Sequence, residues 1–269
     1  AYDPAALTLL AGWTKQCLHR DVAFSRGYFP NEKLDEKRLR HVMAYYYATI
    51  EHIDREVGRM VDVLKKKGIY DNTLIIYTSD HGEYMGYHHM LLKGNYPYDA
   101  LAKVPLIVKY PRSAQAGVAT QGLVNNVDLA PTVLAQTGCT PPPEMRGHDL
   151  ATDPDARSVV FNETRRGTVA MARTKRHKLI QTTDHGVPQF FDLEKDPHEC
   201  DNRYKEPACQ DDINALHQAI EQWRSFDSLP DTYLDEDAPV IDQPNVPDRN
   251  DDHREKLIAY YREKMEAVT

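Results

Sequence analysis

Apolar residues recur every three or four positions between Lys37 and Gly68, and this spacing predicts one long amphipathic helix. The members of this stripe are Val42, Tyr46, Ile50, Ile53, Val57, Met60 and Leu64. The stretch ends in three lysines, which suit the negative end of a helix dipole, and in Gly68, which can adopt the left-handed terminal conformation. We therefore expect the helix to end at Gly68.

Two runs, Thr73–Thr78 and Val104–Tyr110, are apolar on both faces, as expected of strands that helices cover on either side. A helix followed by such a strand is typical of an α/β fold. We therefore predict a central mixed, largely parallel sheet flanked by helices. Two short helices are also expected, one around residues 6–18 and one over residues 129–136, where Asp128 can cap the first turn.

The pattern changes beyond about residue 150 to short segments of strand character. They cover residues 158–162, 168–173, 178–181 and 189–193, and a helical apolar period follows over residues 211–226. These segments predict a small antiparallel sheet with one covering helix. We therefore divide the chain into residues 1–150, the α/β part, and residues 151–269, a small sheet subdomain. The latter should end in a Pro- and Asp-rich arm over residues 229–251 and a helix from about residue 252.

Composition narrows the class of protein. An apolar fraction of 41% and a charged fraction of 28% are ordinary for a folded domain, and no apolar run approaches the roughly 18 residues of a membrane span. A formal charge of −8 argues against binding to nucleic acid or to an anionic membrane surface.

Neither an initiator Met nor a leader precedes Ala1, so we expect a truncated or processed chain and predict no cellular compartment.

The four cysteines are too few for a disulfide scaffold. Cys200 and Cys209 lie close enough in the sequence to be joined across a loop, and the sequence leaves that pairing open.

The residues that carry chemistry follow directly after the first predicted strand. Asp80 and His81 offer a carboxylate and an imidazole, and Gly82 lets the backbone turn so that both can converge on one ion. His88 and Lys93 follow at short distance. Ligand sites of α/β sheets lie at such carboxyl ends of strands. The alternative for this passage alone is a turn in which Asp80 caps a helix and His81 fills a gap.

The wider context resembles the sulfatase family of the alkaline-phosphatase superfamily. In that family a strand leads into Asp-His-Gly or Asp-Asn-Gly, then Gly-x-His, then Lys, and this chain has Asp80-His81-Gly82, Gly86-Tyr87-His88 and Lys93 in the same order. Similar segments flank them, from about residue 45 to residue 202. They include Val127-Asp128-Leu129-Ala130-Pro131-Thr132 and Asp192-Leu193-Glu194-Lys195-Asp196-Pro197-His198-Glu199. The resemblance implies that residues 1–150 are the carboxyl-terminal part of a sulfatase catalytic domain.

The resemblance also implies roles for individual residues. Asp80 and His81 would be two ligands of a divalent cation, Lys93 would hold a sulfate oxygen, and His88 would support Lys93 or act at the leaving group. We expect Asp80, His81 and Lys93 to face one cleft. The family implies calcium, whereas an imidazole ligand favours manganese or zinc. A phosphonate monoester or phosphodiester hydrolase of the same superfamily is therefore the alternative.

The family's nucleophile, a formylglycine made within a Cys/Ser-x-Pro-x-Arg motif, has no counterpart here. Cys139-Thr140-Pro141 lacks the arginine, and so does Ser228-Leu229-Pro230. We therefore expect an amino-terminal partner segment to supply the nucleophile and the remaining ligands, and the chain alone to be inactive. The substrate class would be a sulfate ester, with carbohydrate sulfates favoured. A degenerate binding domain without catalysis is the competing class.

Overall fold

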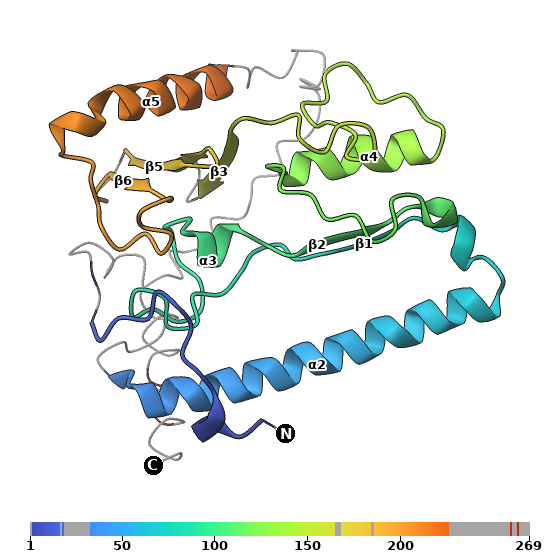
Figure 1. Ribbon diagram of the computed structural model, residues 1–269, viewed down its shortest axis with the longest axis horizontal. Helices are drawn as coiled ribbons and strands as arrows, with labels where there is room; N and C mark the ends of the chain where they lie inside the picture. The colour runs from blue at the N-terminus through green and yellow to red at the C-terminus, as the bar shows by residue number, and fades with distance from the viewer. Residues whose placement is uncertain are drawn as a thin grey trace, which may run out of the picture.

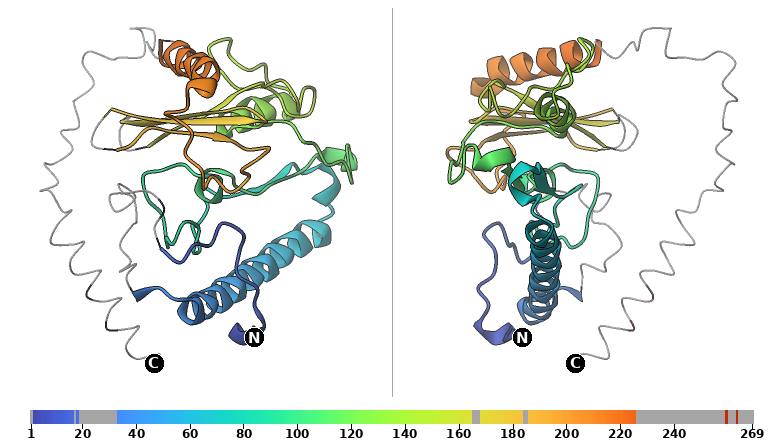
Figure 2. Two further views of the ribbon diagram at one scale, coloured as in Figure 1. Left: turned by 60° about the vertical axis from the view of Figure 1, so that its left-hand side comes forward. Right: turned by 90° about the vertical axis from the view of Figure 1, so that its right-hand side faces the viewer.

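The computed structural model describes residues 2–16, 18, 33–164, 168–183, 186–225, 259 and 263. Helix α2 lies along one side of the molecule, a two-stranded ribbon of β1 and β2 lies next to it, and a four-stranded sheet covered by α5 lies beyond (Figure 1). A second view shows the four-stranded sheet edge-on, with α5 on one face and the α3 region on the other (Figure 2). The predicted arm lies outside the described residues, and so does the predicted terminal helix except for residues 259 and 263.

The long amphipathic helix is confirmed as α2, Glu36–Lys66. The Asp35 side chain accepts a hydrogen bond from the Arg38 amide at 2.8 Å and begins the helix, and Gly68 follows its end with φ 68°. Among the described residues, α2 buries Leu39, Met43 and Ala44, and the stripe beyond them stays largely exposed. No helix of the described part is both long and apolar enough to traverse a membrane.

The two predicted apolar strands are β1, Ile75–Thr78, and β2, Leu106–Lys109. They pair antiparallel, so the expected largely parallel central sheet is not evident in the described part of the chain. A parallel pair needs a crossover that returns the chain to the start of the first strand. The connection here is instead a loop with one helical turn, α3 (Asp99–Ala102), at the same end of the ribbon, so the chain runs straight back along β1.

The small antiparallel sheet with a covering helix is confirmed. Its strands are β3 (Val160–Thr164), β4 (Val169–Arg173), β5 (His177–Thr182) and β6 (Gln189–Asp192), paired in that order. Helix α5, Gln210–Ser225, packs its buried residues Ile213, Leu216 and Ile220 against one face.

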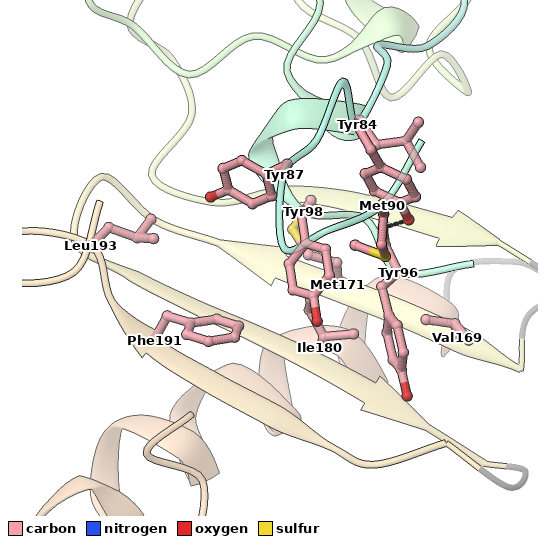
Figure 3. Packing of buried hydrophobic residues seen from close by; sticks show 11 residues of the cluster. Tyr84, Tyr87, Met90, Tyr96, Tyr98, Val169, Met171, Ile180, Phe191 and Leu193 are labelled. Carbon is pink, nitrogen blue, oxygen red and sulfur yellow. Dashed lines mark hydrogen bonds between the residues drawn. The ribbon is translucent and has the colours of Figure 1, made fainter. Parts of the chain in front are cut away.

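The other face of this sheet packs on the segment that follows β1. Tyr84, Tyr87, Met90, Tyr96 and Tyr98 lie over Val169, Met171, Ile180, Phe191 and Leu193 (Figure 3). One apolar cluster thus includes residues from both sides of position 150, while the division into two domains stays a prediction.

Two local expectations were wrong. Residues 6–18 were expected to form a helix, but the described residues there form a 3₁₀ turn at Pro4–Ala6 followed by irregular chain. Helix α4, Leu129–Gln136, lies where it was predicted, yet the Asp128 side chain makes no capping hydrogen bond to it. Asp128 instead turns towards Arg157, because a buried carboxylate is stabilised more by a guanidinium than by one amide. Cys200 and Cys209 are both free thiols.

Candidate active site

The Asp80-His81-Gly82 passage leaves β1 two residues after its last residue, Thr78. Its glycine is required by packing, because a Cβ atom at Gly82 would lie 2.1 Å from the carbonyl oxygen of Ala100. The Gly82 amide donates to the carbonyl of Leu101 at 2.7 Å. This close approach to α3 holds the turn, and the side chains of the preceding Asp80 and His81 are 85% and 39% exposed.

Asp80, His81 and Lys93 lie together, as the sequence predicted. The Lys93 Nζ atom is 3.2 Å from His81 Nε2, and Asp80 Oδ2 is 3.6 Å from the same nitrogen. His81 Nδ1 lies 2.8 Å from the Gly82 carbonyl, which can only accept, so Nδ1 carries the proton and Nε2 keeps its lone pair. Hydrogen bonding from the His81 amide and the nearby imidazole and ammonium lower the pKa of Asp80.

These three side chains line a cleft of about 850 Å³. Its opposite wall is formed by β3 and β4, where Asn162 and Arg173 reach the cleft, and by the 120–126 segment, which contributes Asn126. Arg173 is already paired, because its Nε and Nη2 atoms each lie 3.1 Å from a carboxylate oxygen of Asp99. The lining also includes Lys103, Glu163 and Lys175, so the cleft carries charges of both signs as well as the amides of Asn126 and Asn162.

The segment that carries Lys93 is braced by a second carboxylate. Glu83 accepts hydrogen bonds from the amides of Met85 and Leu92, on both sides of the turn that precedes Lys93. Burial raises the pKa of Glu83, while these amides act in the opposite direction.

His88, a candidate from the sequence, lies in the aromatic core and is not among the residues that line the cleft. Its ring stacks on Tyr87 at 4.3 Å between centroids and meets Tyr98 edge-on at 4.6 Å. Its Nε2 atom is 2.7 Å from the His198 carbonyl. These contacts favour a supporting role within the loop over proton donation to a leaving group.

Sequence reasoning missed a group of buried charges behind the cleft. Lys178 in β5 and Glu199 in the loop after β6 are both fully buried, and both contact Asp99 of α3. The signal that could have revealed them was a lysine within a predicted strand, next to the apolar Leu179 and Ile180, because an ammonium is buried only when it is paired.

The donor set for a metal ion is incomplete within this chain. Asp80 offers an oxygen and His81 a nitrogen lone pair, and a cation could bind both. In the described ranges no three side chains of His, Cys, Asp or Glu gather as a metal site would require. The described residues thus fit two positions of a coordination sphere and do not complete it.

Comparison with known proteins places these features in context. Residues 13–139 match the Sulfatase family, and residues 86–225, more than half of the chain, match the family described as N-sulphoglucosamine sulphohydrolase, C-terminal. The chain is 28% identical over 227 residues to an N-acetylglucosamine-6-O-sulfatase of Bacteroides thetaiotaomicron, covering 78% of this chain and 40% of the relative. It spans about two fifths of the length of such curated relatives.

Two solved structures are similar in fold. Phosphonate monoester hydrolase SpPMH from Silicibacter pomeroyi has a TM-score of 0.69 at 26% identity, covering 83% of this chain and 51% of that one. The protein BT4656, solved in complex with its substrate D-glucosamine-2-N,6-O-disulfate, has a TM-score of 0.65 at 27% identity, covering 71% of this chain and 42% of that one.

Proposed function

Because this chain belongs to the sulfatase family, we propose that it carries one half of the active site of a sulfuric-ester hydrolase. The observation that carries the proposal is the meeting of Asp80, His81 and Lys93 at one end of the cleft, where Lys93 Nζ lies 3.2 Å from His81 Nε2. In this proposal Asp80 and His81 are two ligands of a divalent cation, and Lys93 binds a sulfate oxygen.

Lys93 suits an anionic substrate because of the donors it retains. An ammonium has three N–H groups. The one that points at His81 Nε2 is released when that lone pair binds the cation, so all three can then donate to sulfate oxygens. Its fixed positive charge favours the transition state of S–O cleavage, in which charge grows on the leaving and non-bridging oxygens. A divalent cation at this site would add Lewis-acid polarisation of a sulfate oxygen. We propose calcium from the family resemblance, with manganese or zinc as the alternatives that suit the imidazole.

A carbohydrate sulfate is the proposed substrate class. The sugar substrate of BT4656 and the name of the N-acetylglucosamine-6-O-sulfatase support this choice.

We further propose that an amino-terminal part of the same protein supplies the nucleophile and the remaining metal ligands. Three observations support it: the absence of a Cys/Ser-x-Pro-x-Arg motif from the sequence, the two-fifths coverage of the relatives, and the uncovered apolar surface of α2 and β2. Ile107 of β2, for example, is 64% exposed although the pattern predicts a covered strand. The chain alone would then be inactive.

A phosphonate monoester or phosphodiester hydrolase is the second candidate, and the similarity to SpPMH favours it specifically. The two candidates share the cleft and the cation and differ in the atom that is attacked. A binding domain without catalysis is the third.

The test compares hydrolysis of 4-nitrophenyl sulfate, a glucosamine sulfate and a phosphonate monoester. It uses the 269-residue chain alone and the same chain joined to its preceding coding sequence. We expect sulfate turnover from the longer protein, reduced about 10²- to 10³-fold by Lys93→Ala and abolished by Asp80→Ala. The exposed Lys205→Ala is the matched control and should retain activity. Full activity in Asp80→Ala would refute the metal site, and preference for the phosphonate would favour the second candidate.

A further inference from the structure

The turn that leads to Lys93 has an unusual backbone. Four non-glycine residues, Met85, His88, His89 and Leu92, have positive φ angles between 45° and 65°. Side chains disfavour this region, and several such residues in one short turn persist only where the surroundings determine the conformation. The position of Lys93 therefore depends on groups outside the turn.

The chain on both sides of Lys93 is held by one buried ion pair. Lys178 and Glu199 are 0% exposed, and Lys178 Nζ lies 2.6 Å from Glu199 Oε1. On the amino-terminal side of Lys93, within the turn, the Tyr87 hydroxyl donates to Glu199 Oε2 at 3.0 Å. On the carboxyl-terminal side, the Asp99 amide donates to the same oxygen at 2.7 Å, and Lys178 donates to the Pro97 carbonyl at 3.1 Å and to Asp99 Oδ1 at 2.5 Å.

We propose that Lys178 and Glu199 are positioning residues that fix Lys93 at the cleft from behind, by fastening the chain on both sides of it to the small sheet. The inference rests on the role proposed above for Lys93. It gives the carboxyl-terminal sheet a part in the active site beyond lining the cleft.

Stability alone does not account for this pair. Lys178 shares its face of the sheet with Ile180 and Phe191, so an apolar side chain could pack at that position without any desolvated charge. Replacing a buried ion pair by apolar residues is often neutral or stabilising. The ammonium instead uses its three N–H groups on three separate acceptors, in Pro97, Asp99 and Glu199, which an apolar residue could not bring together.

The charges of the network are balanced. Arg173 pairs with Asp99 on the cleft side of the network, so two cations face two carboxylates. Removing Lys178 or Glu199 alone leaves a buried charge without its partner. The double variant Lys178→Met/Glu199→Gln keeps the balance between Arg173 and Asp99 and is the variant expected to fold.

Hydrogen exchange of the full chain measures the positioning without any need for activity. In the double variant we expect amides of residues 83–99 to exchange at least tenfold faster, while α5 exchanges at the wild-type rate. Tyr87→Phe, which removes one hydroxyl and keeps the ring, should accelerate the same segment about threefold. Glu51→Gln, which breaks an exposed ion pair on α2, is the control and should leave residues 83–99 unchanged.

A second measurement concerns turnover by the longer protein. The double variant should lower kcat at least tenfold, with KM changed less than threefold. Wild-type exchange over residues 83–99 in both the double variant and Tyr87→Phe would overturn the proposal, and so would equal acceleration in all segments. Local acceleration in a protein whose wild type hydrolyses no sulfate ester would leave the positioning intact and refute the proposed function instead.

Discussion

The Asp128 side chain forms a buried ion pair instead of capping helix α4. It lies just before α4, where a carboxylate ordinarily caps a helix, but it is 1% exposed and accepts hydrogen bonds from the amides of Asn125 at 2.8 Å and His148 at 2.9 Å. Arg157 completes the site through Nε and Nη2. Burial acts to raise the pKa of Asp128, but these hydrogen bonds and the guanidinium outweigh it and hold the pKa below its ordinary value.

Asp128→Asn should lower the free energy of unfolding at pH 7 by about 3–5 kcal/mol, because it leaves the largely buried Arg157 without its counter-charge. Since the folded-state pKa lies below the unfolded value of 3.8, the ionised carboxylate stabilises the fold above about pH 4. That contribution is lost as the pH falls through the folded-state pKa. Urea unfolding at pH 7 and pH 3 should show the difference between wild type and variant shrinking.

The control for this prediction is a solvent-exposed ion pair of the same protein. Glu51 and Arg55 form an exposed pair on α2, and Glu51→Gln should change the free energy of unfolding by less than about 1 kcal/mol at either pH. An Asp128→Asn effect that is equally large at pH 3 would show that packing, and not charge, holds this site.

Helices and strands with a strong local pattern were predicted well at the scale of the element. The period-3.6 stripe of α2 and the run of short strands after residue 150 are properties of neighbouring residues, so one sequence suffices to find them. The helix expected over residues 6–18 failed because its partners are distant. The His88 amide donates to the Gly12 carbonyl at 2.9 Å, and Trp13 stacks on His89 at 5.0 Å between centroids.

The residues of the site divide in the same way into those that a local sequence pattern can predict and those that it cannot. Asp80, His81 and Lys93 lie within one short passage, and the spacing of a family motif can place them. Lys178 and Glu199 act on residues some eighty to one hundred positions earlier in the chain, and no pattern within one segment connects them. The antiparallel pairing of β1 with β2 was missed for a related reason, since strand direction depends on the path of the connection.

Helix α5 offers a test of element packing. Ile220 is fully buried between α5 and the sheet, so Ile220→Ala should lower the free energy of unfolding by about 2–5 kcal/mol. The next residue, Glu221, points to solvent, and Glu221→Ala should stay within about 0.5 kcal/mol of wild type. Urea unfolding measures both, and equal costs would contradict the assigned helix face.

At the scale of the whole molecule, the apolar stripe of α2 is the feature that the described residues leave unexplained. The stripe is covered at its beginning, where Leu39 and Met43 pack against Met85 and Leu91. Further along the same face, Ile50 is 43% exposed and Ile53 is 44% exposed. An apolar stripe that continues beyond the residues packed on it indicates that a further part of the protein covers the rest of the stripe. We expect the proposed amino-terminal part of the domain to pack on this face.

The stripe therefore supports a comparison between the chain alone and the longer protein. Ile50→Ser and Ile53→Ser change apolar surface with little change in helix propensity. In the chain alone each should cost less than about 0.5 kcal/mol of unfolding free energy, because both side chains already contact water. In the longer protein each should cost about 1–3 kcal/mol, the value for apolar side chains removed from water. Met43→Ala, buried in the chain itself, should cost about 2–5 kcal/mol in both proteins. Equal costs of the isoleucine substitutions in the two proteins would show that this face of α2 stays in solvent and that the added part packs elsewhere.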